Sequence, residues 1–189
     1  MLGPNGSGKT TLLRMLALNT LLAQIGSFVP AHRFVFALFS AIFAKLSFSE
    51  SIELGLGSYL SELRDIATIN QNILKRSLVV VDELGSTTSH SSSLPVCSAF
   101  SEFFLTAKDC MFFFSTHNSS LAKVISRNYS SARRLFMNAS LENTPSSKEI
   151  MKFSYQVEEE KCEVKAKKQT NKEMIELYGI RMAEALGLP

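Results

Sequence analysis

Gly3-Pro4-Asn5-Gly6-Ser7-Gly8-Lys9-Thr10 begins with a glycine, continues through four residues and ends in Gly-Lys-Thr, the spacing of a phosphate-binding loop. In such a loop, glycines let successive backbone N–H groups curve around phosphate oxygens. Lys9 would bring a cation to those oxygens, and the Thr10 hydroxyl is a suitable Mg²⁺ ligand. The residues that we predict to bind a nucleotide here are Gly3, Pro4, Asn5, Gly6, Ser7, Gly8, Lys9, Thr10 and Thr11.

The residues after this loop have the periodicity of a buried helix. Apolar or small side chains recur at helical spacing, at Leu12, Leu13, Leu16, Ala17, Thr20 and Leu21. The pattern predicts a helix from Lys9 to about Gln24 that ends near Gly26, with the positive end of its dipole at the phosphates. A glycine-rich turn that precedes a helix by chance is the alternative, and the helical context favours the nucleotide site.

A second element suited to nucleotide chemistry follows at Leu78-Val79-Val80-Val81-Asp82-Glu83. A run of aliphatic residues is typical of a central parallel strand that is buried on both faces and ends at the carboxyl edge of the sheet. There Asp82 could hold Mg²⁺, and Glu83 could orient or deprotonate the attacking water as a catalytic residue. The two acids could instead simply end a strand, but their combination with the phosphate-binding loop indicates a nucleotide hydrolase.

His117 follows the next apolar run, Cys110-Met111-Phe112-Phe113-Phe114-Ser115, which also predicts a buried strand. Strand ends of a parallel sheet meet at one edge, so His117 is expected close to Asp82. From there it could contact the γ-phosphate or its attacking water, and we include it among the catalytic candidates. The alternative is an ordinary loop histidine.

The alternation of helical and strand patterns predicts an α/β fold with three layers and a mostly parallel central sheet. Charged residues from Glu158 to Lys172 indicate a solvated loop. The other expected segments are strands within His32–Phe48, a helix at Tyr59–Leu74, a loop at Gly85–Ser93, a helix at Val96–Thr106, a helix at Ser119–Arg127, strands at Ala132–Ala139 and Glu149–Val157, and a helix at Lys172–Leu186.

Composition sets broad limits on the class of protein. The chain has 189 residues and is 46% hydrophobic, which suits a single domain over residues 1–189. A net charge of +3 neither requires nor excludes nucleic acid. Cys97, Cys110 and Cys162 lack the spacing of a zinc site or a disulfide framework, which predicts reduced thiols in an intracellular protein. The most apolar run, Phe34 to Leu46, is too short for a membrane span, so no membrane partner is expected.

Several further strings carry a family resemblance. The sequence resembles the C-terminal ATPase domain of the MutS family of DNA mismatch-recognition proteins, an ABC-type ATPase domain. Ile25-Gly26-Ser27-Phe28-Val29-Pro30-Ala31 is its most specific part, since phosphate-binding loops are common to many families. The other matching strings are Gly3-Pro4-Asn5 with Gly8-Lys9-Thr10, Ser58-Tyr59-Leu60-Ser61-Glu62-Leu63, Leu78 to Gly85, Ser115-Thr116-His117, Tyr178-Gly179-Ile180 and Leu186-Gly187-Leu188-Pro189.

The resemblance implies ATP and Mg²⁺ as cofactors, with Thr10 and Asp82 at the metal, Glu83 at the water and His117 as the γ-phosphate switch. It also implies a homo- or heterodimer with a MutS-family subunit, in which Ser58 reaches the partner's nucleotide. DNA would be bound through this complex, which would act as a DNA-dependent ATPase and be nuclear in a eukaryote. The strings Ala23 to Gly26 and Asp82 to Gly85 resemble the meiotic eukaryotic branch, the MutS homologue 4 type, somewhat more closely.

The sequence also departs from the family pattern. Gly6-Ser7-Gly8 lacks the family's usual Met, Gly57 replaces a usual Ser, and Gly85-Ser86-Thr87-Thr88 replaces Gly-Arg-Gly-Thr. Met1-Leu2 is a short remnant of the strand expected before the loop, so we expect the sheet to lack its first strand, in a fragment of a longer product or a relic. A degenerate module that binds ATP without turnover therefore remains an alternative. A transporter ATPase subunit is disfavoured, because Gly57 to Ser61 does not match a Leu-Ser-Gly-Gly-Gln signature.

Overall fold

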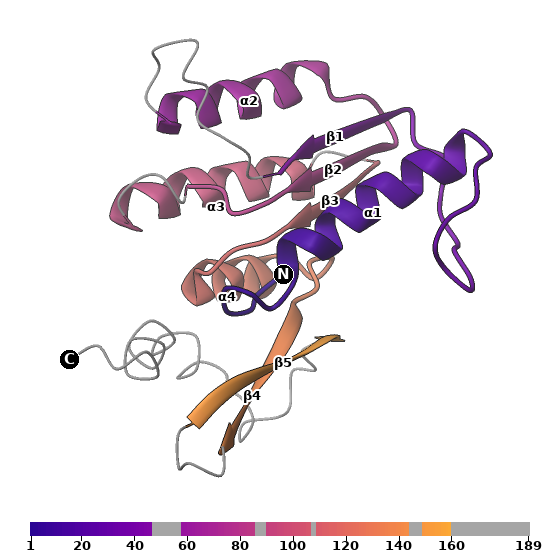
Figure 1. The fold of residues 1–189 in the computed structure, drawn as a ribbon. Coiled ribbons are helices and arrows are strands. Elements are labelled where there is room, and N and C mark those ends of the chain that lie inside the picture. The colour runs from indigo at the N-terminus through magenta and orange to yellow at the C-terminus, as the bar shows by residue number, and fades with distance from the viewer. Residues whose placement is uncertain (47–57, 86–89, 107–108, 144–148, 160–189) are drawn as a thin grey trace.

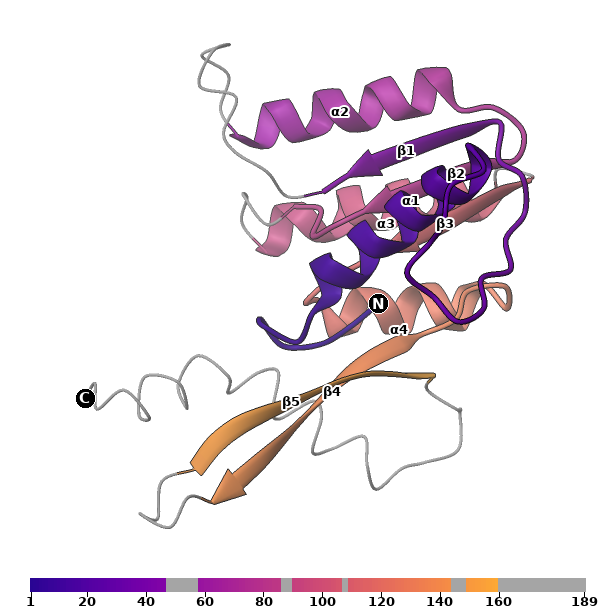
Figure 2. The ribbon, with the colours of Figure 1, turned by 45° about the vertical axis from the view of Figure 1, so that its right-hand side comes forward.

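The computed structural model describes residues 1–46, 58–85, 90–106, 109–143 and 149–159. Strands β1 (Ala41–Lys45), β2 (Ser77–Val81) and β3 (Cys110–Phe114) form a parallel sheet in the order β1-β2-β3. Helix α1 (Lys9–Gln24) packs on one face, while α2 (Ser58–Asn72), α3 (His90–Thr106) and α4 (Ser119–Asn128) contribute to the core on the other (Figures 1 and 2). The predicted α/β class with a parallel sheet between helical layers is confirmed.

Strand β2 is at the centre of the sheet, and all its residues are buried. Successive side chains of a strand point to opposite faces. Leu78 and Val80 therefore pack with Leu13 and Ala17 of α1, whereas Val79 and Val81 join the core on the opposite face. This two-sided burial explains why the sequence of β2 is continuously aliphatic rather than alternating.

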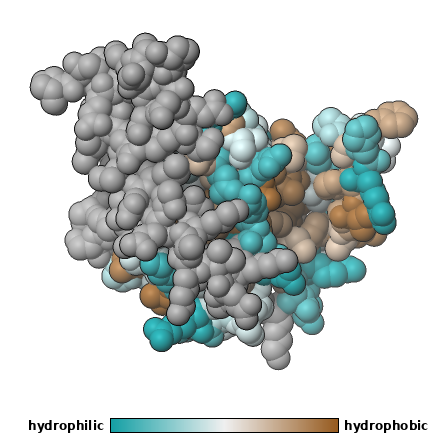
Figure 3. Space-filling model, turned by 90° about the horizontal axis from the view of Figure 1, so that it is seen from below, coloured by the Kyte–Doolittle hydropathy of each residue, from teal (hydrophilic) through white to brown (hydrophobic). Residues whose placement is uncertain are grey.

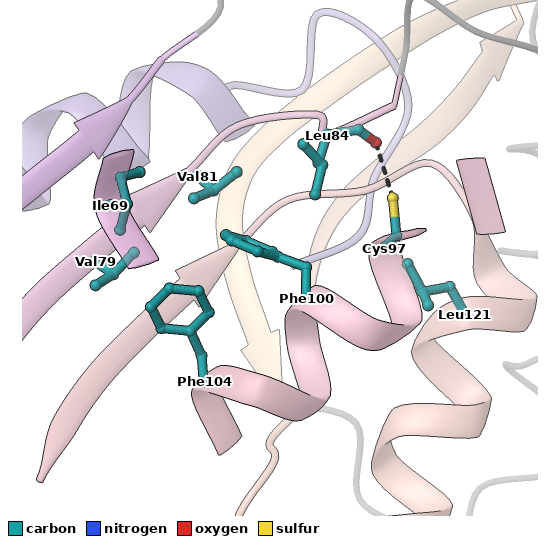
Figure 4. Close-up of a cluster of buried hydrophobic side chains, with 8 residues drawn as sticks. All are labelled: Ile69, Val79, Val81, Leu84, Cys97, Phe100, Phe104 and Leu121. Carbon is teal, nitrogen blue, oxygen red and sulfur yellow. Dashed lines mark hydrogen bonds between the residues drawn. The ribbon is translucent and has the colours of Figure 1, made fainter. Parts of the chain in front are cut away.

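The larger core cluster lies between the sheet and α3 (Figure 4). The rings of Phe100 and Phe104 meet edge to face at a centroid distance of 4.6 Å, and Phe104 stacks on Phe112 of β3 at 5.0 Å. Cys97 donates a hydrogen bond to the carbonyl oxygen of Leu84 at 3.2 Å, and burial raises the pKa of its thiol to about 11. Cys97 and Cys110 carry thiols in the structure; Cys162 lies outside the described residues.

The register of the sheet determines which residues meet at its carboxyl edge. Lys45 pairs with Val81, and Val81 pairs with Phe114, so the three strands end level with one another. The chain continues this pattern beyond β3, because the Ser115 N–H donates to the carbonyl oxygen of Val81 at 3.0 Å. Asp82 and Ser115 are therefore brought side by side.

Strands β4 (Leu135–Asn143) and β5 (Glu149–Glu159) form an antiparallel pair with an irregularity between Met137 and Ala139. Leu2 makes a parallel bridge to β4, in which its N–H donates to Leu135 at 2.8 Å and its carbonyl accepts from Met137 at 2.9 Å. The carbonyl of Met1 in turn accepts from the Thr116 N–H at 3.0 Å. Residues 1–2 thus connect the end of β3 to the β4–β5 pair.

Two predicted elements differ from the structure. The strands expected within His32–Phe48 shorten to β1 at Ala41–Lys45, because only these residues pair with β2. The loop expected at Gly85–Ser93 is wrong from residue 90 on, since α3 begins at His90 and includes Pro95. Serine-rich sequence favours turns locally, but burial of Ser93 beside Gly85 favours the helix.

Most of the other element predictions agree with the structure. Helix α1 has the predicted bounds and is followed by Gly26 with a φ of 78°. The charged loop predicted at Glu158–Lys172 is wrong for Glu158 and Glu159, which belong to β5. The rest of that loop and the predicted helix Lys172–Leu186 lie outside the described residues. In the part of the chain that is described, no helix has the length and apolar character needed to cross a membrane.

Candidate nucleotide-binding site

The glycine-rich loop is folded around its own lysine. Lys9 is buried, and its Nζ donates to the carbonyl oxygens of Gly3 at 2.9 Å and Pro4 at 3.0 Å. Gly6 and Gly8 have φ values of 79° and 93°, a region that glycine adopts without steric cost. A Cβ at Gly3 would lie 2.8 Å from Ser7 Oγ, so this close turn also requires glycine.

Ser7 has a buried hydroxyl whose hydrogen-bonding function is unfilled, because within the described ranges no group is placed to hydrogen-bond with it. Buried polar atoms without a partner are uncommon and call for an explanation. A phosphate oxygen would supply one, because a hydroxyl can donate to it.

Aromatic side chains of β5 pack against the loop. A Cβ added to Gly6 would lie 3.3 Å from the ring of Phe153, and one added to Gly8 would lie 3.3 Å from Tyr155 and 3.4 Å from the methyl of Met137. Phe153, Tyr155 and Met137 were not predicted from the sequence as part of the site. Their alternation as Phe153-Ser154-Tyr155 indicates a strand face, but nothing in it indicates a contact with the first residues of the chain.

Asp82 connects the strand edge to the loop. It is fully buried, and its Oδ2 accepts a hydrogen bond from Thr10 Oγ1 at 2.5 Å. Its Oδ1 accepts one from the hydroxyl of Ser115, which the sequence analysis did not identify as a site residue. A carboxylate and a hydroxyl placed in this way are oxygen donors of the kind that Mg²⁺ uses.

Glu83 lies between the side chains of His117 and Lys9. Its Oε1 is 2.7 Å from His117 Nε2 and 3.6 Å from Lys9 Nζ. The hydrogen bond from His117 holds the pKa of Glu83 below its usual value, although burial opposes this shift. Glu83 also has a φ of 48°, a left-handed conformation that is uncommon for a residue with a side chain.

Burial lowers the pKa of Lys9 below its ordinary value, and the carboxylates of Glu83 and Asp82 oppose that shift. The structure thus gathers five of the predicted site residues from separate elements at one edge of the sheet: Lys9, Thr10, Asp82, Glu83 and His117. The donor set fits Mg²⁺ with a phosphate group, since Mg²⁺ in such sites takes one or two carboxylates and completes its shell with phosphate and water.

The remaining predicted residues are less closely involved. Pro4 is buried and supplies a carbonyl to Lys9, whereas Asn5 and Thr11 are exposed. Ser58 is the first residue of α2, which begins at the same sheet edge as the loop (Figure 1). Its proposed contact with a partner's nucleotide stays a prediction. Across the described residues, no group of three His, Cys, Asp or Glu side chains could hold a metal ion.

Fold and site together define an α/β domain in which a glycine-rich loop, the helix after it and an acidic strand end converge. The family model described as MutS domain V matches residues 1–189. The chain therefore belongs to the MutS family, and the resemblance read from its sequence is confirmed.

Individual relatives support the same assignment. The chain is 33% identical over 187 residues to the DNA mismatch repair protein MutS of Borreliella afzelii (strain PKo), which covers 99% of this chain and 19% of that protein. It is 32% identical over 187 residues to the human MutS protein homolog 4, with the same two coverages. The DNA mismatch repair protein MSH4 of Arabidopsis thaliana is 30% identical over 189 residues, which covers 100% of this chain and 22% of that protein.

The chain therefore spans about a fifth of the length of these relatives. Its identity to a bacterial MutS and to the two homologue 4 proteins is nearly the same. The closer resemblance to the homologue 4 branch stays a prediction.

Proposed function

We propose that this chain binds Mg·ATP at the glycine-rich loop and hydrolyses it as the ATPase part of a MutS-family DNA mismatch repair or recombination protein. The observation that carries the proposal is the convergence of five side chains, in which Thr10 donates a hydrogen bond to Asp82 and Glu83 contacts both Lys9 and His117. A phosphate-loop ATPase of the ABC type requires these groups at one edge of a parallel sheet.

Each side chain has a role that its surroundings support. Lys9 and the glycine-rich backbone would bind the phosphates, while Thr10 and Asp82 would hold Mg²⁺, which neutralises charge on the phosphate oxygens. Glu83 would orient the attacking water and accept its proton. Glu83 is ionised at neutral pH, as a group that accepts a proton must be, and the hydrogen bond from His117 orients its carboxylate.

The dimer and the DNA are further parts of this proposal. The relatives from Borreliella afzelii and Arabidopsis thaliana are named as DNA mismatch repair proteins, and the family resemblance implies a partner subunit whose Ser58 equivalent completes the site. In a eukaryote such a complex would act in the nucleus. ATP binding would then close one subunit on the other and switch the DNA-bound dimer.

The test is ATP binding and turnover by the wild-type chain, Lys9→Ala and Glu83→Ala, each with and without a candidate MutS-family partner. Lys9→Ala is expected to lose ATP affinity by about 10-fold or more, as removal of a buried charged hydrogen-bond donor predicts. Glu83→Ala should still bind ATP but turn it over about 10²-fold more slowly, because it lacks its general base. The absence of Mg·ATP binding from every wild-type mixture would sink the proposal.

A module that binds ATP without hydrolysing it is the second candidate. It is favoured by the sequence after Glu83, where Ser86 replaces the Arg of the family pattern. The same experiment distinguishes the ATPase from the non-hydrolysing module. If the wild-type chain binds ATP but does not turn it over, Glu83→Ala has no activity to reduce, and the result supports the non-hydrolysing module.

A further inference from the structure

We infer that Ser115 is a positioning residue that orients the metal-binding carboxylate of Asp82 and holds the backbone of Glu83. The inference rests on the proposed Mg·ATP site and deepens it. Ser115 is fully buried one residue beyond β3, and the hydrogen bonds of its hydroxyl are made to Asp82 and Glu83. Its influence on a nucleotide would therefore pass through the two acids.

The hydroxyl of Ser115 uses both of its hydrogen-bonding functions on these acids. It donates its proton to Asp82 Oδ1 and accepts the N–H of Glu83 at 3.0 Å. A serine hydroxyl has only one proton to donate, so this donation is fully committed to Asp82. The same oxygen thus ties together the side chain proposed to hold the metal and the backbone of the proposed base.

The two oxygens of Asp82 consequently face different partners. Oδ1 accepts from Ser115 on the β3 side, while Oδ2 accepts from Thr10 at the start of α1. Rotation of the carboxylate would break both hydrogen bonds in a fully buried environment. Ser115 therefore selects the orientation in which Oδ2 faces the hydroxyl with which it would share Mg²⁺.

The bond to the Glu83 N–H has a separate effect. Glu83 has a φ of 48°, which is costly for a residue with a side chain and persists only where its surroundings enforce it. The hydrogen bond from its N–H to Ser115 is one such constraint. It helps to direct the carboxylate of Glu83 toward His117 and Lys9.

The experiment compares wild type with Ser115→Ala, Ser115→Thr and a matched control, Ser101→Ala. Ser101 is also fully buried, but its hydroxyl has no partner among the groups that the structure describes. Binding of a fluorescent ATP analogue is measured as Mg²⁺ is titrated and again in excess EDTA, and thermal unfolding is recorded for each variant.

For Ser115→Ala, the Mg²⁺ concentration at half-saturation should rise by about 10-fold or more, as is typical when a partner of a metal ligand is removed. Its affinity for the analogue in EDTA should be unchanged. Ser115→Thr, which keeps a hydroxyl, should restore the wild-type Mg²⁺ dependence, and Ser101→Ala should not alter it. A purely structural role would lower the unfolding temperature without shifting the Mg²⁺ requirement.

The possible results distinguish failure of the proposed ATP site from failure of the proposed role of Ser115. If wild type binds no analogue with Mg²⁺, the proposed function fails and this inference fails with it. If wild type binds but Ser115→Ala has the same Mg²⁺ requirement as Ser101→Ala, only the role of Ser115 is overturned. Should Ser115→Ala not fold, hydrogen exchange in wild type decides, because rapid exchange of the Glu83 amide would contradict its bond to Ser115.

Discussion

At the scale of single residues, a polypeptide that is prepared to begin at Met1 would bury its α-amino group at the end of β3. The amino group donates a hydrogen bond to the carbonyl oxygen of Phe114. Burial lowers its pKa from 8.0 to about 5, and repulsion from Lys9 contributes in the same direction. The folded protein therefore favours the neutral form of this amino group, which hydrogen-bonds to the last residue of β3.

For a polypeptide that is prepared to begin at Met1, this burial predicts a pH dependence of folding. Between pH 5 and 8 the unfolded amino group binds a proton that the folded one does not, so the free energy of unfolding should rise with pH. The shift from 8.0 to about 5 corresponds to a rise of up to about 4 kcal/mol. Urea unfolding at a series of pH values measures it.

Acetylation of the amino group provides the control, because it removes the titration while keeping an N–H donor. The rise between pH 5 and 8 should then disappear. Glu83 acts in a different range: its lowered pKa means that its contribution is lost as the pH falls below 4.5, with or without the acetyl group. An equal pH 5 to 8 slope in both forms would contradict the prediction.

The sequence indicated Lys9, Thr10, Asp82, Glu83 and His117 because each follows a recognisable loop or strand pattern. Their proximity in the structure is consistent with the roles proposed for them. Ser115, Phe153 and Tyr155 could not be found in this way. Their contacts depend on strand register and on packing between distant segments, which no local pattern encodes.

At the scale of elements, the connection from β2 to α3 is tightly constrained. Gly85 has a φ of 77°, and its N–H donates to Glu62 Oε2 on α2 at 3.1 Å. Glu62 also forms a buried ion pair with Lys45 of β1 at 2.9 Å. The segment that follows the catalytic candidates is thus held by a neighbouring strand and a neighbouring helix.

Gly85→Ala is expected to destabilise the protein strongly. A Cβ there would lie 2.6 Å from the Cβ of Ser93, whereas at Gly26, which has a similar φ of 78°, it would meet no atom within 4 Å. Gly26→Ala therefore carries the backbone cost alone, about 1–2 kcal/mol. Gly85→Ala should cost about 1–3 kcal/mol more through overpacking. Denaturant unfolding of both variants measures the difference, and equal losses would refute the steric argument.

Elements with strong periodicity were predictable, and those that depend on tertiary contacts were not. The apolar run in β2 and the helical repeat in α1 each identify their element from a few residues. The apolar residues at 32–39 were read as strand by composition, yet they find no neighbouring strand. The first turn of α3 was not predicted, because its serines have a low intrinsic propensity for helix. Packing against the rest of the protein, rather than helix propensity, stabilises this turn.

At the scale of the whole molecule, apolar side chains are exposed along the segment that leaves α1. These are Ile25, Phe28, Val35 and Leu38, and Phe28 is 100% exposed. In Figure 3, brown apolar groups lie open among teal polar ones on the described part of the face seen from below. Exposed apolar surface of this kind favours association between molecules.

Phe28→Ser should reduce self-association of the isolated chain at high concentration. The free energy of unfolding should change by less than about 0.5 kcal/mol, because the ring makes no buried contact. Phe28→Leu is the matched control, which keeps an apolar side chain and should keep the association. Sedimentation velocity over a range of protein concentrations measures the effect, and indistinguishable profiles for Ser and Leu would contradict it.

The bridge between Leu2 and β4 also sets an order of events during synthesis. The glycine-rich loop leaves the ribosome well before Leu135 and Met137, the residues that pair with the segment preceding the loop. Closing so long a loop is slow, because the entropy cost precedes the contacts that repay it. The loop around Lys9 can therefore reach its final shape only after β4 has been translated, so nascent chains that end before β4 should lack it.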